Sequence, residues 1–395
     1  MKKIAAVITC LIVFQLSQAQ TRVITTGVPF LLVAADARAA GMADNGVATS
    51  PDVYSQQWNP AKYAFSRDKQ GFSVGYTPYL VELVNDISLS QVTYFNKYSE
   101  RSSFAASIRY FSLGEIELRQ NAEDQPTVVK PAEYALDLSY ALKLSPKFSM
   151  SVAGRYIRSN LRIPSEGSSS AAASSFAFDV SGYHEGEEMA FNNFNGKLRY
   201  GFNIQNIGPK INYDKASDEA GSNFLPSNLK VGAGFDFILD EYNKVALNLE
   251  FAKLLVPTPI EPKPVDLNGD GDTNDANEDG IAQANIDYDK IGWTSGIIKS
   301  FGDAPGGFSE ELKEFTYSVG AEYLYQDSFA FRLGYFHESP DKGARKFFSL
   351  GAGFKYNIIK VDVSYLFSAS KVKNPLENTL RFSLSFAFGD KYDEY

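Results

Sequence analysis

The residues best suited to binding a metal ion lie in one acidic stretch, residues 266–280. Oxygen-bearing side chains occupy every second position at its start, namely Asp266, Asn268, Asp270 and Asp272. With Gly271 in sixth place, this spacing matches the first half of an EF-hand calcium loop. The twelfth position, where that loop has a bidentate Glu, is Asn277. The stretch predicts calcium binding by those four residues, with a solvated acidic loop held by Asx turns as the alternative.

His337 and Ser339 form the second group of residues whose types and spacing could support a chemical reaction. Residues two apart on a strand share a face, and a His base beside a Ser nucleophile could hydrolyse an ester. The pair resembles the His-x-Ser of outer-membrane lipid A deacylases, although an interfacial His followed by a loop Ser fits the same residues. The only other histidine is His184, and the chain has no Gly-x-Ser-x-Gly elbow, phosphate loop or dinucleotide fingerprint. This inventory predicts a protein that is not an enzyme.

The start of the chain predicts a secretory signal peptide, residues 1–19. Two lysines precede an apolar run over residues 4–16, and a small-x-small cleavage site ends at Ala19. The single cysteine, Cys10, lies inside this segment, so the mature chain from Gln20 onward is expected to have none. The mature protein would then have no disulfide, thiolate nucleophile or cysteine metal site.

Apolar and polar side chains alternate over most of the chain that follows. In one run the apolar residues are Leu380, Phe382, Leu384, Phe386 and Phe388. A period of two predicts strands with one apolar face and one polar face. We expect about fourteen strands, at 71–80, 86–96, 102–113, 132–144, 147–160, 174–184, 197–207, 227–238, 243–255, 315–325, 328–338, 345–356, 358–369 and 378–388. Each is about ten residues long, which spans a bilayer when the strand is tilted.

The predicted connections alternate in length. Every second one is short, at 97–101, 145–146, 239–242, 326–327 and 357, while those between include long ones at 114–131, 161–173, 208–226 and 256–314. Short turns at one end and long loops at the other are typical of outer-membrane barrels, whose long loops face the exterior. The link at 185–196 is an exception, because it has medium length on the short side. On this interpretation both ends of the mature chain lie in the periplasm.

These patterns predict an all-β fold, a transmembrane antiparallel β-barrel of about 14 strands in the outer membrane. Closure of the barrel leaves no unpaired strand edge in hydrocarbon. A soluble β-sandwich is the alternative, but it does not account for the signal peptide and the loop asymmetry. The net charge is −9, which becomes −11 without Lys2 and Lys3, and this acidity argues against nucleic acid as a partner.

Charged residues of both signs are predicted to face the inside of the barrel. They are Arg109, Asp137, Arg155, Asp179, Arg199, Lys230, Asp236, Glu250, Glu322, Arg332, Lys355, Lys360, Asp362 and Arg381. Such a mixed set favours a lumen cross-linked by ion pairs, and an ion path is the alternative. We therefore expect no wide, open, selective pore.

Short stretches ahead of the first strand form a recognisable pattern, at 27–31, 35–42, 46–50 and 58–62. The last contains Asn59, Pro60 and Ala61, a triplet also found ahead of the first strand in FadL-type barrels. Residues 205–211 and 225–226 fit later strands of the same kind of protein. Together these stretches resemble the PorV family of the type IX secretion system. The acidic stretch at 266–280 is not a feature of that family.

The resemblance implies a FadL-like barrel over residues 66–395, with residues 20–65 as a hatch-like segment in or under it and a long acidic exterior loop at about 256–314. It also implies a non-enzymatic role. Family members bind the C-terminal signal domains of secreted cargo, partner the large translocon barrel, and pass cargo to a cell-surface sortase attachment complex. The alternative is a FadL-like transporter of hydrophobic solutes, which needs an apolar pocket behind the N-terminal segment. A lipid A hydrolase is the third hypothesis.

Overall fold

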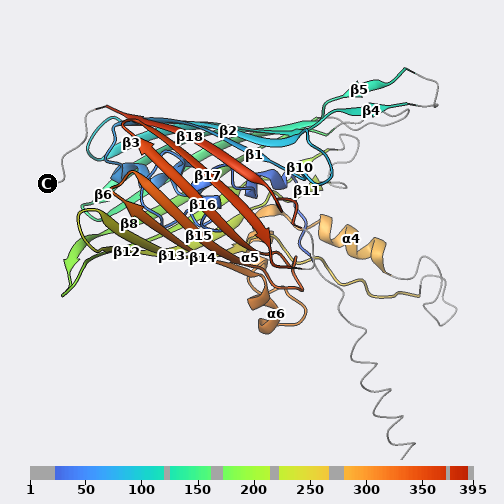
Figure 1. The fold of residues 1–395 in the computed structure, drawn as a ribbon. Coiled ribbons are helices and arrows are strands. Elements are labelled where there is room, and N and C mark those ends of the chain that lie inside the picture. Colours follow the sequence, from blue (N-terminus) through green and yellow to red (C-terminus); the bar gives the residue numbers. More distant parts are fainter. Residues whose placement is uncertain are drawn as a thin grey trace, which may run out of the picture.

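The computed structural model describes residues 23–119, 125–161, 172–213, 222–266, 280–370 and 374–389. Fourteen antiparallel strands form a closed barrel in which β1 pairs with β18 (Figure 1). The barrel strands are β1 (Gln70–Pro78), β2 (Ile87–Lys97), β3 (Ser102–Leu113), β6 (Ala132–Ser145), β7 (Phe148–Asn160), β8 (Ala173–Ala190), β9 (Asn195–Ile207), β12 (Asn228–Ile238), β13 (Asn243–Leu254), β14 (Phe315–Tyr325), β15 (Phe329–His337), β16 (Lys346–Tyr356), β17 (Ile359–Ser368) and β18 (Leu380–Phe388). The predicted barrel is therefore confirmed.

The outer surface of the barrel is apolar and its inner surface is polar. In β6, the outward Leu136, Leu138 and Tyr140 are exposed, whereas the intervening Asp137 and Ser139 are buried. This is the reverse of a soluble sandwich, which would turn its apolar faces inward. An outward apolar band on a closed barrel suits a lipid environment, where all backbone groups must pair within the protein.

The predicted strand ends lie within two residues of the observed ones, except at the end of β8. This strand continues to Ala190, and β9 starts at Asn195, so only residues 191–194 form the turn. The prediction of a medium-length link at 185–196 is therefore wrong. The register of β8 and β9 shifts between Glu185 and Glu188. Such a bulge interrupts the period of two on which the prediction depended.

The two ends of the barrel differ, as the loop lengths predicted. One end, called the short-turn end, has the tight turns and the end of β18. The other, called the long-loop end, has two hairpins and three helices that the sequence did not predict (Figure 1). These elements are β4 (Ile116–Leu118), β5 (Thr127–Val129), β10 (Ile211–Asn212), β11 (Ser222–Asn223), α4 (Ile281–Asp289), α5 (Trp293–Lys299) and α6 (Phe308–Lys313). Within the described ranges, no helix is long and apolar enough to cross a membrane.

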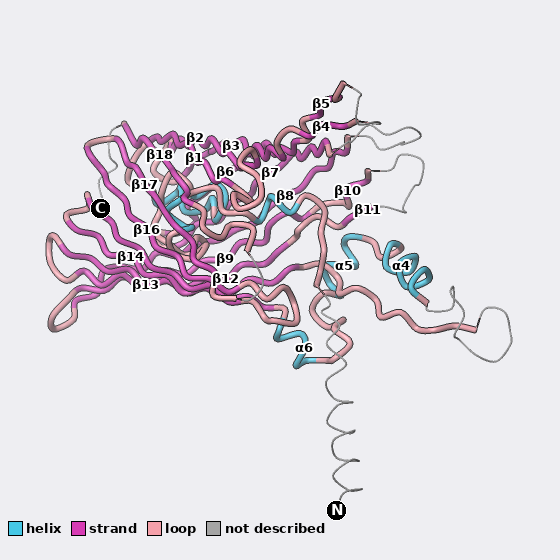
Figure 2. The backbone as a smooth tube through the Cα atoms, turned by 45° about the vertical axis from the view of Figure 1, so that its right-hand side comes forward, coloured by secondary structure: helices cyan, strands magenta, loops and turns pink. Residues whose placement is uncertain are grey.

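Residues 23–66, called the N-terminal segment, precede β1. Their short helices are η1 (Pro29–Leu32), α2 (Ala37–Ala40), α3 (Ser55–Trp58) and η2 (Pro60–Phe65). Figures 1 and 2 both show these helices among the barrel strands. Side chains from strands on all sides hydrogen-bond to the segment, among them Thr77, Arg109, Ser139, Ser149, Asn203, Ser349 and Ser383. The segment therefore contacts the inward face of the barrel around its circumference.

The first described residues lie at the long-loop end. The backbone N–H of Gly27 donates to the carbonyl oxygen of Phe224, ahead of β12, at 2.9 Å. The ring of Phe30 stacks on Phe111 near the end of β3, with ring centroids 6.0 Å apart. The prediction that the mature chain both starts and ends on the periplasmic side is therefore wrong for the start of the described chain. The end of β18 does lie at the short-turn end.

Candidate functional site

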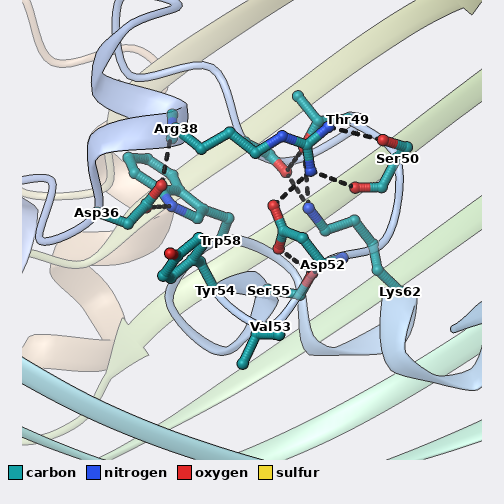
Figure 3. A network of polar contacts seen from close by, with 12 residues as sticks. Asp36, Arg38, Thr49, Ser50, Asp52, Val53, Tyr54, Ser55, Trp58 and Lys62 are labelled. Atoms are coloured by element: carbon teal, nitrogen blue, oxygen red, sulfur yellow. Dashed lines mark hydrogen bonds and ion pairs between the residues drawn. The ribbon is translucent and has the colours of Figure 1, made fainter. Parts of the chain in front are cut away.

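Asp36 begins helix α2 and ties it to α3 (Figure 3). Its Oδ1 accepts a hydrogen bond from the backbone N–H of Ala39 at 2.8 Å, which makes it an N-cap. Its Oδ2 accepts from the indole Nε1–H of Trp58 at 2.6 Å. Burial, assisted by repulsion from Asp52, raises the pKa of Asp36 to about 6. The charge on this carboxyl group therefore changes just below neutral pH.

Arg38, on the same helix, joins the N-terminal segment to the barrel wall. Its Nη2 lies 2.8 Å from Oε2 of Glu322 on β14 and also donates to Oγ of Ser50 at 2.7 Å. Its Nη1 binds the carboxylate of Asp52 (Figure 3). Because a guanidinium presents its donors in a fixed fork, these contacts fix residues 50–52 relative to β14.

Lys62, on η2, is fully buried beside this group (Figure 3). Its Nζ donates to the carbonyl oxygen of Gly46 at 2.8 Å and to Oγ1 of Thr49 at 2.9 Å. Burial lowers the pKa of Lys62 to about 8, although the charge of Asp52 opposes that change. Arg38 and Lys62 lie in the stretches 35–42 and 58–62, on which the family resemblance rests, but neither was predicted to have a role. The local signal is a charged residue in a mostly uncharged stretch, where burial without a partner is costly.

Ion pairs continue across the inner wall. Arg332 on β15 lies 2.7 Å from Glu322 and 2.8 Å from Asp362 on β17. Arg155 on β7 binds Asp179 on β8 at 2.9 Å. Counting partners among the described residues only, all the charged residues predicted to face inward, except Lys355, have an oppositely charged partner within 4.0 Å. The prediction of a cross-linked lumen is thereby confirmed.

Inward-facing glycines admit the backbone of the N-terminal segment. A Cβ atom at Gly334 on β15 would lie 2.3 Å from the backbone nitrogen of Ala43. A Cβ atom at Gly75 on β1 would lie 2.2 Å from the carbonyl oxygen of Ala35. Real Cβ atoms do not approach so closely, so these positions require glycine for steric reasons.

The predicted family motif, Asn59, Pro60 and Ala61, connects α3 to η2 and to the wall. The Asn59 side chain accepts from the backbone N–H of Ala61 at 3.1 Å and donates to the carbonyl oxygen of Gly182 on β8 at 3.0 Å. Pro60 starts η2, where a missing backbone N–H has no cost. The carbonyl oxygen of Ala61 accepts from Ser149 on β7 at 2.7 Å. The motif therefore holds the N-terminal segment against two adjacent strands.

A cavity of about 1500 Å³ opens at the short-turn end. It is lined by Arg38 and residues 50–54 of the N-terminal segment and by turn residues such as Lys147 and Asp240. Lys355 lines it as well. Many of the lining side chains are charged, with both signs present, which differs from the mostly apolar pockets that bind hydrophobic solutes.

At the long-loop end, the loops pack on one another to form what we call the loop platform, residues 208–213, 222–227, 255–266, 280–314 and 338–345. Tyr288 on α4 meets Phe224 edge-on, with ring centroids 5.5 Å apart. Nζ of Lys210 donates to the carbonyl oxygen of Asp289 at 2.7 Å. Nζ of Lys342, between β15 and β16, lies 2.9 Å from Oε1 of Glu314. These contacts join three separate connections into one surface.

The predicted calcium ligands fall mainly outside the described residues. Asp266 is described, whereas Asn268, Asp270 and Asp272 are not. Among the residues that the structure does describe, no group of three or more His, Cys, Asp or Glu side chains could hold a metal ion. Calcium binding by residues 266–280 therefore stays a prediction.

His337 and Ser339 do not form a catalytic pair in the structure. His337 is the last residue of β15, its ring stacks on Tyr317 at 4.7 Å, and its Nδ1 lies 3.3 Å from the hydroxyl oxygen of Tyr335. Ser339 lies beyond the strand, where its Oγ accepts from the backbone N–H of Asp341 at 3.4 Å. The two side chains therefore share no strand face, and His337 belongs to an aromatic group on the outer surface.

Hydrocarbon channels and transporters are among the solved structures that resemble this one in fold. A TodX monoaromatic hydrocarbon channel mutant matches with a TM-score of 0.50 and 9% identity, covering 90% of this chain and 98% of that one. The toluene transporter TodX of Pseudomonas putida matches with a TM-score of 0.49 and 9% identity, covering 90% and 98%. A FadL homologue of Pseudomonas aeruginosa matches with a TM-score of 0.44 and 12% identity, covering 93% and 100%. No curated protein sequence matches the chain.

The closed fourteen-stranded barrel, its outward apolar band and its likeness in fold to the TodX channel define a FadL-like outer-membrane β-barrel. The family model of the type IX secretion system protein PorV matches residues 16–261, which is more than half of the chain. This chain therefore belongs to the PorV family. The resemblance found in the sequence is confirmed, as is the outer-membrane location.

Proposed function

We propose that this protein is the outer-membrane component of the type IX secretion system that binds the C-terminal signal domains of secreted cargo. The loop platform is the binding surface in this proposal. Cargo would arrive from the translocon barrel and leave to the cell-surface sortase attachment complex. The protein would perform no chemistry itself and would act as a rigid receptor.

The observation that carries this proposal is the contrast between the inside of the barrel and its long-loop end. Inside, the N-terminal segment is held by buried ion pairs such as Arg38 with Glu322. Outside, three connections pack into one surface that presents exposed apolar side chains, including Ile281 and Ile286 of α4. Rigid scaffolds with elaborate loops at one end commonly bind partners through those loops, and exposed apolar residues favour protein partners.

The experiment compares two sets of variants in a strain that lacks the gene. Ile281→Ser with Ile286→Ser alters the loop platform, and Tyr242→Ser alters an equally exposed residue at the short-turn end. The platform variant is expected to leave cargo precursors in the periplasm, whereas Tyr242→Ser restores secretion. Mass spectrometry of the medium and the cell surface measures both. Normal secretion in the gene-deletion strain would refute the proposal.

The same strain tests the alternative of a FadL-like transporter of hydrophobic solutes. That function requires an apolar route, whereas the lining of the cavity at the short-turn end includes many charged side chains of both signs. Normal secretion together with impaired growth on long-chain fatty acids would support the transporter instead.

A further inference from the structure

Lys253 occupies an unexpected position on β13. Its two predecessors on the same strand face, Leu249 and Phe251, point outward and are exposed. Lys253 pairs in register with the outward Phe315 on β14, and its Nζ lies 5.5 Å from the centre of that ring. Strand alternation therefore places Lys253 on the outer side of the wall. Its exposure is nevertheless only 2%, so another part of the chain covers it from outside.

Helix α6 provides that cover. Nζ of Lys253 lies 3.2 Å from Oε2 of Glu311 and also binds Glu314. Lys342 adds a second cation, 2.8 Å from Oε1 of Glu310 and 2.9 Å from Oε1 of Glu314. The acidic face of α6 is thus turned toward the protein and neutralised there. The helix consequently lies outside the barrel wall at the long-loop end, beside the ends of β13 and β14, as Figures 1 and 2 show.

The opposite face of α6 is apolar and uncovered. Phe308 is 77% exposed and Leu312 is 54% exposed. Their spacing of four places both on one helix face, and the outward Phe315 follows three residues later. Ile298 of α5 and Phe301 just after it are also exposed. A helix on a water-soluble protein shows the reverse arrangement, with apolar residues buried and charges outside.

This apolar face adjoins the lipid-facing row of β14 along the chain, because Leu312 lies three residues before the outward Phe315. Phe315 is followed on the same outward row by Tyr317, whose ring stacks on His337 of the neighbouring strand. Stacked aromatic residues at the end of an apolar band mark the interface between hydrocarbon and headgroups. Helix α6 ends at Lys313, just before that row begins and on the same side of the wall, which is where an interfacial helix contacts lipid.

We propose that Phe308 and Leu312 of α6 form a membrane-contacting ridge that inserts into the outer leaflet of the outer membrane. The occupant of this surface is lipid, because the exposed Phe308 and Leu312 lie on the same side of the wall as the outward row of β14 and directly precede it along the chain. The pairing of Glu311 and Glu314 with Lys253 and Lys342 removes from the interface the charges that would oppose insertion. The ridge would thereby anchor one edge of the loop platform at the bilayer surface.

Depth-dependent quenching tests the proposal on the full-length protein in phosphatidylcholine vesicles. The only cysteine is Cys10, so a Cys10→Ser background accepts a single labelled cysteine at a chosen site. Phe308→Cys and Leu312→Cys, labelled with an environment-sensitive fluorophore, report on the ridge. Leu138→Cys, at a 69% exposed position on the barrel wall, is the lipid control, and Glu117→Cys on the exposed β4 hairpin is the water control.

The proposal expects labels at 308 and 312 to be quenched by lipids brominated near the headgroup, at least threefold more than the label at 117. The label at 138 should respond more to bromines deeper in the chain. Labels at 308 and 312 that behave like the label at 117 would overturn the proposal, and the ridge would then be a surface for a protein partner. The experiment contains no cargo, so its failure would leave the proposed secretion role untouched.

A second variant shows whether the ion pairs hold the ridge in place. Lys253→Met in the Phe308→Cys background removes the cation that Glu311 and Glu314 share. Quenching at 308 is expected to fall toward the level at 117, because Glu311 loses its cation and Glu314 keeps only Lys342, so that the helix is drawn toward water. Heat-modifiable migration in gels confirms that the barrel itself remains folded. Unchanged quenching would show that Lys253 has no part in positioning the ridge and would overturn that step of the proposal.

Discussion

Arg38 and Glu322 are separated by 284 residues along the chain, yet their side chains form a buried bidentate pair, with Nη2 and Oε2 2.8 Å apart. The pair connects helix α2 of the N-terminal segment to strand β14 of the wall. Glu322 also binds Arg332, and Arg38 also binds Asp52. The contact therefore joins the ion pairs of the N-terminal segment to the ion pairs of the barrel wall.

Arg38→Ala is expected to loosen the N-terminal segment without unfolding the barrel. Removal of one partner leaves Glu322 and Asp52 buried with one cation fewer, a change that costs about 3 kcal/mol. The cost lies at the lower end of the usual range because Arg332 still neutralises Glu322. Faster amide hydrogen exchange over residues 35–60, measured by mass spectrometry, checks the prediction. Arg119→Ala, which breaks an exposed pair with Glu117, is the control.

Gly334→Ala is expected to displace the N-terminal segment by steric overlap. The added methyl group would overlap the backbone of Ala43 and Met42, with a Cβ placed 2.3 Å from the nearest atoms. Overpacking of this kind typically costs about 1–3 kcal/mol. We expect stepwise currents in planar bilayers where the unaltered protein has none. Gly154→Ala is the matched control, because a Cβ at this glycine meets nothing within 4 Å. Equal behaviour of the two variants would contradict the steric explanation.

The strands could be predicted from the sequence because alternation is a local property. Each outward residue in a run such as Leu136, Leu138 and Tyr140 is apolar regardless of what its neighbours in space are. The same alternation correctly placed Glu322, Arg332 and Asp362 on the inner face. It failed at the end of β8, where a bulge near Glu188 interrupts the period.

The contacts made by the N-terminal segment could not be predicted, because they exist only once the barrel has closed. No local pattern pairs Arg38 with Glu322. Inward-facing glycines such as Gly75 and Gly334 admit backbone atoms of the N-terminal segment, a requirement that no local pattern shows. Lys253 interrupts an apolar row of β13, and only the position of α6 in the folded protein accounts for its burial.

Between about pH 4 and 7, the stability of the N-terminal segment is expected to depend on Asp36. Its folded pKa of about 6 lies above the ordinary value of 3.8, so the native state binds a proton more tightly than the unfolded state. The stabilising contribution is fully present below about pH 4 and is lost as the pH rises through 6. Hydrogen exchange over residues 35–60 should therefore be slower at pH 5 than at pH 7, after correction for the intrinsic rate.

Asp36→Asn provides the control for that pH dependence. The amide oxygen can still accept from Ala39 or Trp58, but the side chain no longer titrates, so the difference between pH 5 and pH 7 should shrink. Lys62 does not interfere, because its lowered pKa of about 8 leaves it charged in both states over this range. If the difference in hydrogen exchange between pH 5 and pH 7 persists unchanged in Asp36→Asn, another group is responsible for the pH dependence.

Lys253→Met is expected to release the connection between β13 and β14 from the outer wall. Two carboxylates, Glu311 and Glu314, lose a buried cation, which costs about 3 kcal/mol by the rule for broken buried pairs. The matched control is Lys244→Met at the short-turn end, whose partially exposed pair with Asp327 contributes at most about 1 kcal/mol. Limited proteolysis should cut Lys253→Met within residues 255–314 several times faster than either the unaltered protein or the control, while the barrel resists digestion. Equal rates would mean that the apolar contacts of Tyr288 and Phe224 hold this loop without help from the ion pairs.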